Sequence, residues 1–163
     1  SRPGVHRLTP TEVTMKKALA VLAVGLLVAA DRPISDEAKA DLKKLAGTWA
    51  LMEEVSDGQK RDDDYVKKIK WVINEDGSWK VLEDGKDKYR GKLTVDPTKK
   101  PKTIDFSPTE GEQQGKVYQG IYEIEEKKRK LCFAPPGGER PTEFVSTTGS
   151  EHILVHFERE TSK

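Results

Sequence analysis

Short runs of alternating apolar and polar residues, each ended by a turn signal, occupy the chain from Thr48 to Arg159. The clearest run covers residues 88–95, where one face of the predicted strand carries Tyr89, Gly91, Leu93 and Val95. Asp-Gly pairs separate several of the runs, and no helical period lies between them. We therefore predict an all-β domain, a closed antiparallel up-and-down barrel of about eight strands, with a β-sandwich as the alternative.

A short helix is expected before the first strand. Ser35 is a suitable N-cap, acidic residues follow it, and Gly47 is a typical helix stop. We predict a helix at about 35–46 and a barrel at about 48–160. A chain of 163 residues holds one core comfortably, so residues 31–163 are expected to form a single domain.

The N-terminal thirty residues have the pattern of an export signal. Met15-Lys16-Lys17 precedes the apolar segment 18–28, which is shorter than the roughly 20 residues of a membrane span. We predict that residues 1–14 are an upstream extension, that cleavage occurs near Ala30, and that the mature domain is periplasmic or extracellular. The sole cysteine, Cys132, lies far from that site, so neither a lipid anchor nor an intramolecular disulfide is expected.

Charge excludes some partner classes. Charged residues make up 35% of the chain, with 29 bases and 28 acids, and the first thirty residues hold more bases than acids. The remaining domain is nearly neutral, without the basic footprint of a nucleic-acid or anionic-membrane binder. The sequence has no Gly-rich phosphate loop, Ser-His-Asp arrangement or Cys-x-x-Cys pair, so we expect no cofactor. We also expect the protein to be a monomer.

No metal site is expected either. His152 and His156 share one face of a strand but lie about 13 Å apart there, too far to bind one ion. The run Asp62-Asp63-Asp64 lacks the spaced ligands of a calcium loop. The basic run from Lys127 to Lys130 is expected to form a solvated hairpin tip that protects a strand end.

A barrel whose first strand starts with Gly-x-Trp after a short helix, and whose last strand ends in an inward arginine, resembles the lipocalin and calycin pattern. The resemblance implies that Gly47, Trp49 and Arg159 close one end of the barrel. Because strands one and eight are neighbours in such a barrel, we expect the Arg159 guanidinium within about 6 Å of the Trp49 ring.

The chain more closely resembles a family of small exported lipocalin-like domains of uncharacterised function, expanded in planctomycete bacteria. The strings that carry this resemblance are Leu45-Ala46-Gly47-Thr48-Trp49, residues 96–105, Gly120-Ile121-Tyr122-Glu123, residues 131–137 and Arg140-Pro141-Thr142-Glu143-Phe144. The resemblance implies the fold and export, and brings no established activity.

Three functions remain open. The first is a non-enzymatic barrel that binds a small apolar or amphipathic ligand in an interior lined by Trp71, Trp79, Tyr89, Phe106, Tyr122 and Phe133. The second is a cell-envelope interaction module that uses a rigid rim loop with Pro135, Pro136, Arg140 and Pro141. The third is an enzyme, since alternation places Glu53 inward among apolar neighbours, where a carboxylate is a candidate general base.

Overall fold

The computed structural model describes residues 34–161. The predicted upstream extension and signal segment, residues 1–30, lie outside the described residues. Export and cleavage near Ala30 therefore stay predictions.

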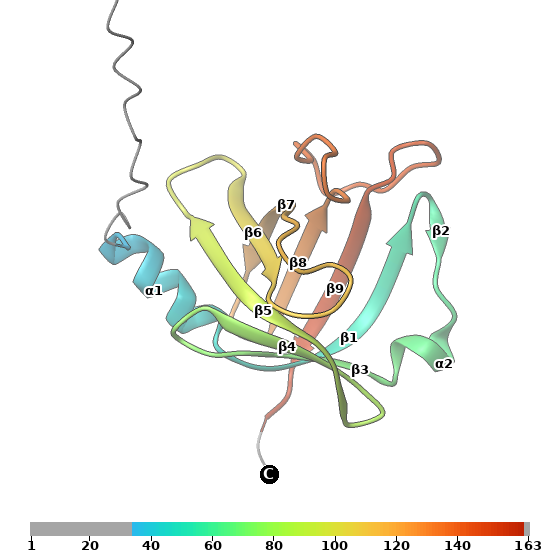
Figure 1. The fold of residues 1–163 in the computed structure, drawn as a ribbon, viewed down its shortest axis with the longest axis horizontal. Coiled ribbons are helices and arrows are strands. Elements are labelled where there is room, and N and C mark those ends of the chain that lie inside the picture. Colours follow the sequence, from blue (N-terminus) through green and yellow to red (C-terminus); the bar gives the residue numbers. More distant parts are fainter. Residues whose placement is uncertain (1–33, 162–163) are drawn as a thin grey trace, which may run out of the picture. The chain divides into compact units, whose positions relative to one another are not determined.

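Nine antiparallel strands form one sheet in the order β2-β1-β3-β4-β5-β6-β7-β8-β9, and β1 also pairs with β9 (Figure 1). β2 only extends the end of β1, so the other eight strands form a closed barrel. The predicted barrel is confirmed and the sandwich alternative is wrong. The strands are β1 Gly47–Ser56, β2 Gln59–Lys60, β3 Ile69–Ile73, β4 Ser78–Glu83, β5 Lys86–Asp96, β6 Lys102–Pro108, β7 Tyr118–Ile124, β8 Lys128–Phe133 and β9 Ile153–Arg159.

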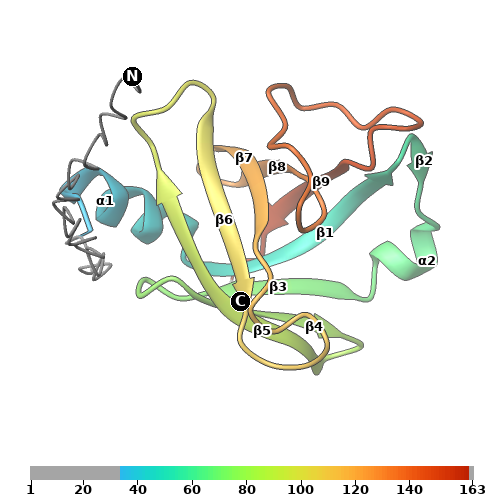
Figure 2. The same cartoon turned by 45° about the horizontal axis from the view of Figure 1, so that its top comes forward.

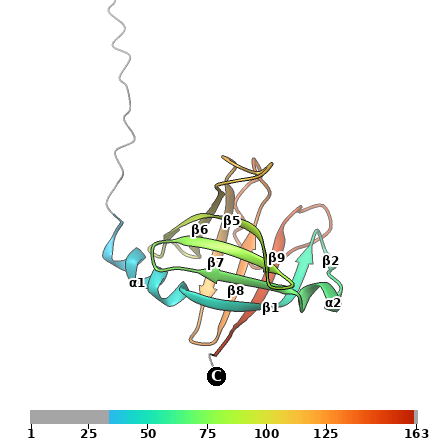
Figure 3. The same ribbon diagram turned by 60° about the horizontal axis from the view of Figure 1, so that its bottom comes forward.

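Two helices lie at opposite ends of β1 (Figure 3). The predicted N-terminal helix is α1, Asp36–Leu45, in which the Ser35 hydroxyl accepts a hydrogen bond from the Ala38 amide at 3.1 Å. The other helix, α2, is a single turn at Asp63–Val66. Because the chain enters the barrel directly after α1, this helix is fixed at the end where β1 starts.

A buried carboxylate attaches α1 to the barrel. Asp41 is 3% exposed, and its Oδ2 accepts hydrogen bonds from Lys102 Nζ at 2.6 Å and from the Tyr122 hydroxyl at 2.7 Å. Burial alone raises the pKa of Asp41, but the hydrogen bonds from Lys102 and Tyr122 and the nearby lysine charges outweigh it and leave this pKa below its ordinary value. The helix is thus connected to β6 and β7 through one ionised group.

Trp49 and Arg159 close the same end of the barrel. The Arg159 guanidinium lies 4.1 Å from the centre of the Trp49 ring, which confirms the predicted contact. Arg159 also donates to the carbonyls of Ala46 at 2.6 Å, Glu126 at 3.0 Å and Lys44. Gly47 is required here, because a Cβ at this position would meet Arg159 Nη1 at 2.6 Å.

The other end of the barrel is bordered by α2 and by the loop between β6 and β7. This loop lies beside β4 and β5 (Figure 2), and the Thr109 amide donates to the Arg90 carbonyl at 3.1 Å. The interior between the two ends is filled mainly by apolar side chains from all eight barrel strands and from both helices. Gly91 lets β5 approach them, since a Cβ there would meet Trp79 Cζ2 at 2.6 Å.

We predict that Asp41→Asn destabilises the domain by about 1 to 3 kcal/mol at pH 7, because a charged acceptor of two hydrogen bonds is lost. The pKa of Asp41 is depressed in the folded state, so its contribution is complete above the unfolded value of about 3.8 and disappears as pH falls through the folded value. Urea unfolding as a function of pH measures this effect: the difference in free energy of unfolding between the wild type and the Asp41→Asn variant should decrease below pH 3.8.

Asp36→Asn is the matched control on the same helix, because the Asp36 side chain is 96% exposed. It should leave the free energy of unfolding within about 0.5 kcal/mol of the wild type. An Asp41→Asn variant as stable as this control would contradict the attachment of α1 through Asp41.

Candidate functional site

A cavity of about 320 Å³ lies at the barrel end away from α1. Its walls come from the last residues of β1, β6 and β8, the first residues of β3, β5, β7 and β9, and from β4, α2 and the β6–β7 loop. Two tyrosines at its mouth, Tyr65 and Tyr89, are exposed to solvent. The lining residues are Glu54, Tyr65, Ile69, Trp71, Trp79, Val81, Tyr89, Phe106, Pro108, Gln113, Tyr118, Phe133 and Ile153.

Five of the six aromatic residues predicted for the interior line this cavity: Trp71, Trp79, Tyr89, Phe106 and Phe133. The sixth, Tyr122, is inside the barrel but at the α1 end, where it binds Asp41. Sequence alternation gave the correct face for all six. It could not give their height in the barrel, which depends on the stagger between strands.

Trp71 is at the centre of the aromatic wall. Its ring stacks on that of Trp79 at 5.9 Å, meets the edge of Phe106 at 5.3 Å and lies 5.4 Å from Phe157. Trp79 is 6% exposed, and its Nε1 has no hydrogen-bond partner in the described part of the chain. The wall therefore offers flat apolar surface, while the Trp79 Nε1 donor is buried and unpaired within the described residues.

The prediction that Glu53 faces the interior is wrong. The pairing of β1 with β9 shifts between Leu51 and Glu53, so Met52 bulges out and is 50% exposed. Beyond this bulge the alternation is reversed. Glu53 lies outside the cavity, 3.4 Å from Lys60 and 3.6 Å from His156, and gives no support for a catalytic base in the barrel.

Glu54 is the carboxylate that lines the cavity. Its side chain is 15% exposed, and its Oε1 accepts a hydrogen bond from Arg61 Nε at 3.0 Å. Arg61 also lies 5.3 Å from the centre of the Tyr65 ring. Burial and the Glu54 charge raise the pKa of Tyr65, so its hydroxyl stays protonated as a donor at the mouth.

Arg129 is the interior residue that the sequence analysis missed. Its predicted place in a solvated hairpin tip is wrong, since it is 3% exposed. The guanidinium lies 4.2 Å from the centre of Phe157, 4.7 Å from Trp49 and 5.7 Å from Trp71. The alternation of Leu131 and Phe133, extended two residues back along β8, would have placed Arg129 inward.

The charge of Arg129 has no polar partner. Its Nε, Nη1 and Nη2 are all buried without a hydrogen-bond acceptor within residues 34–161. Burial, followed by repulsion from Arg159, lowers the pKa of Arg129. A guanidinium nevertheless stays protonated at neutral pH, so the interior carries an unpaired positive charge held against aromatic rings.

The proline-rich loop after β8 is packed on the outside of the sheet. Arg140 Nη1 donates to the carbonyls of Gly120 at 2.7 Å and Ile104 at 3.2 Å, and lies 2.7 Å from Asp105 Oδ1. Pro141 is fully buried, whereas Pro135 and Pro136 are half-buried. The loop covers the outer face of β7 and β8, where burial raises the pKa of the Cys132 thiol to about 11.

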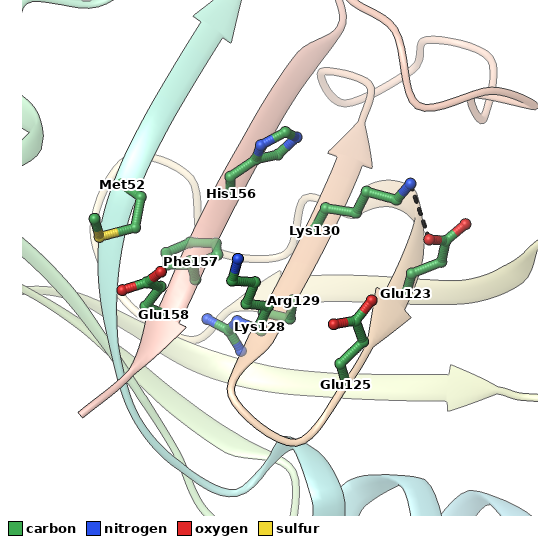
Figure 4. Close-up of a pocket in the computed structure, with 9 residues that line it drawn as sticks. All are labelled: Met52, Glu123, Glu125, Lys128, Arg129, Lys130, His156, Phe157 and Glu158. Carbon is green, nitrogen blue, oxygen red and sulfur yellow. Dashed lines mark ion pairs between the residues drawn. The ribbon is translucent and has the colours of Figure 1, made fainter. Parts of the chain in front are cut away.

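A second hollow of about 290 Å³ lies over strands β7, β8, β9 and β1, on their outer face (Figure 4). Figure 4 shows Lys130 pointing toward Glu123, and their charged atoms are 2.8 Å apart. Arg129 borders this hollow, but its guanidinium lies among the interior rings. The outer hollow is thus lined by acidic and basic side chains, some of which pair with each other, and by the thioether of Met52. It offers a small ligand less apolar contact surface than the aromatic cavity does.

Within the described residues, no three His, Cys, Asp or Glu side chains come together in a way that would hold a metal ion. Between residues 34 and 161, no helix has the length and apolar character needed to cross a membrane. No protein-family model, curated protein or solved structure matches the chain. The resemblance to exported lipocalin-like domains therefore stays a prediction from the sequence.

We predict that Glu54→Gln lowers the free energy of unfolding by about 1 kcal/mol, because it removes the charge of a side chain that is only 15% exposed and accepts a hydrogen bond from Arg61. Glu53→Gln, the matched change at the preceding residue, should cost less than about 0.5 kcal/mol, because the Glu53 side chain itself is 36% exposed and its ion pair with Lys60 lies on the surface. Chemical unfolding of the two variants checks this. A larger loss for Glu53→Gln would contradict the bulge that separates the two carboxylates.

Proposed function

We propose that this protein is an exported, non-enzymatic barrel that binds one small apolar or amphipathic ligand in its interior. The observation that carries the proposal is the cavity of about 320 Å³, lined mainly by aromatic rings. Ligand sites are typically concave and apolar with a few polar groups, and this cavity is within their size range. The sequence pattern of residues 15–30 supports export.

The arrangement of the two barrel ends also supports this function. Trp49, Arg159 and α1 close one end, while the cavity is at the other. The mouth carries the hydroxyls of Tyr65 and Tyr89 and the amide of Gln113. The apolar body of an amphipathic ligand would contact the aromatic rings inside the cavity, and its polar end would meet the polar groups at the mouth.

The two alternatives receive less support. An interaction surface on the rim loop would need free side chains, but Arg140 and Pro141 are used to fix this loop to the sheet. An enzyme based on Glu53 would need this carboxylate in the cavity, and Glu53 lies outside it.

We predict that the neutral fluorescent probe N-phenyl-1-naphthylamine binds with one-to-one stoichiometry and competes with any native ligand. Ile153→Trp places an indole in the cavity and should weaken probe binding about tenfold or more, equivalent to 1.4 kcal/mol. Fluorescence titration, with thermal unfolding to confirm the fold, measures both effects.

Val145→Trp is the matched control, because Val145 is 47% exposed and is not part of the cavity lining. It should bind the probe like the wild type. Unsaturable binding to the wild type, or equal affinity in the Ile153→Trp variant, would overturn the interior site.

A further inference from the structure

Four buried nitrogen atoms in the barrel interior have no acceptor within residues 34–161: Trp79 Nε1 and the three side-chain nitrogens of Arg129. Buried polar groups in proteins are nearly always hydrogen-bonded, and an unpaired buried charge is costlier still. From this excess of donors we propose that the interior ligand carries a carboxylate, which is bound by Arg129 behind the cavity wall that Trp71 forms. This inference rests on the proposed interior-binding function and specifies the class of ligand.

Within residues 34–161 no carboxylate accepts a hydrogen bond from the Arg129 guanidinium, although Glu123, Glu125 and Glu158 border the outer hollow beside this residue. The rings of Trp49, Trp71 and Phe157 lie within 6 Å of its guanidinium, and they come from β1, β3 and β9. Arg159 is near enough to repel it. The nearest buried acid toward α1, Asp41, already accepts from Lys102 and Tyr122. Cation–π contacts offset part of the desolvation cost of the Arg129 guanidinium, yet they leave its N–H groups without hydrogen-bond acceptors.

Trp71 connects Arg129 to the cavity. Of the three rings around the guanidinium, it is the one that also lines the cavity, and it stacks on Trp79. Arg129 does not itself line the cavity, so the carboxylate reaches its guanidinium only if the Trp71 ring moves out of this stack. Trp71 is only half-buried, which is consistent with such a movement.

The charge balance favours a single negative charge. Glu54, the ionisable group that lines the cavity besides the tyrosines, is already paired with Arg61 at 3.0 Å. This leaves one uncompensated positive charge in the interior, that of Arg129. A monoanion neutralises it, whereas a doubly charged phosphate would bring an unpaired negative charge into an aromatic cavity. The bidentate geometry of a guanidinium also matches a carboxylate.

The test compares two probes with the same ring system, 2-naphthoate and neutral 2-naphthamide, by calorimetry in 0.5 M salt, where surface charges are screened. The wild type should bind the carboxylate about tenfold or more tightly than the amide. Arg129→Met should abolish this preference while amide binding is retained. Because the change replaces an unpaired buried charge by an apolar side chain, its melting temperature should equal or exceed that of the wild type.

Lys130→Met is the matched control, since Lys130 is the next residue on β8 and forms an ion pair with Glu123 on the outer face. It should keep the wild-type preference for the carboxylate. If the wild type binds both probes equally, or if Arg129→Met keeps the preference, the role of Arg129 is overturned while interior binding stands. If neither probe binds, the proposed function itself fails. An Arg129→Met variant that unfolds would leave the wild-type comparison of the two probes as the deciding measurement.

Discussion

The pairing of β1 with β9 is the constraint on which the rest of the structure depends. It turns an open sheet into a barrel with an interior and two ends. At one end Arg159 holds the last strand against the chain that leaves α1, through stacking on Trp49 and hydrogen bonds to the carbonyls of Lys44 and Ala46, and a third hydrogen bond joins it to Glu126 in the β7–β8 turn. At the opposite end an aromatic cavity borders solvent.

The same closure creates an electrostatic problem in the interior. Trp49 lies near two guanidinium groups, but only Arg159 has carbonyl acceptors. The Arg129 guanidinium has aromatic contacts but no hydrogen-bond acceptor within residues 34–161, and Arg159 repels it, so we expect it to weaken the folded state relative to an apolar side chain of similar size. Residues that on balance destabilise the fold are typical of functional sites. This is why the proposed ligand is placed in the interior around Arg129 and Trp71 and not on the outer surface.

Both faces of the barrel wall are used. The inner face carries the core, while the loop that follows β8 covers outward-facing Ile121 and Cys132, which are also buried. Arg140 fixes this loop through backbone carbonyls of two neighbouring strands. A proline-rich segment that looks like an exposed rim in the sequence is therefore part of the packing, and the extra layer helps a domain without a disulfide to bury apolar surface.

The sequence by itself determined the strand periodicity, the helix before β1, the barrel-closing contact of Trp49 and Arg159, and the inward face of six aromatic residues. The strand faces follow from residue alternation, and the helix follows from its N-cap and its glycine stop. The contact of Trp49 with Arg159 follows because the first and last strands of a closed barrel are neighbours. Only the tertiary structure decided which carboxylate faces the cavity, because one bulged residue, Met52, exchanges Glu53 for Glu54. It also decided that the Arg129 guanidinium has no hydrogen-bond acceptor within residues 34–161 and that the proline loop is packed, because both depend on what lies against each face of the barrel, which the spacing of residues does not give.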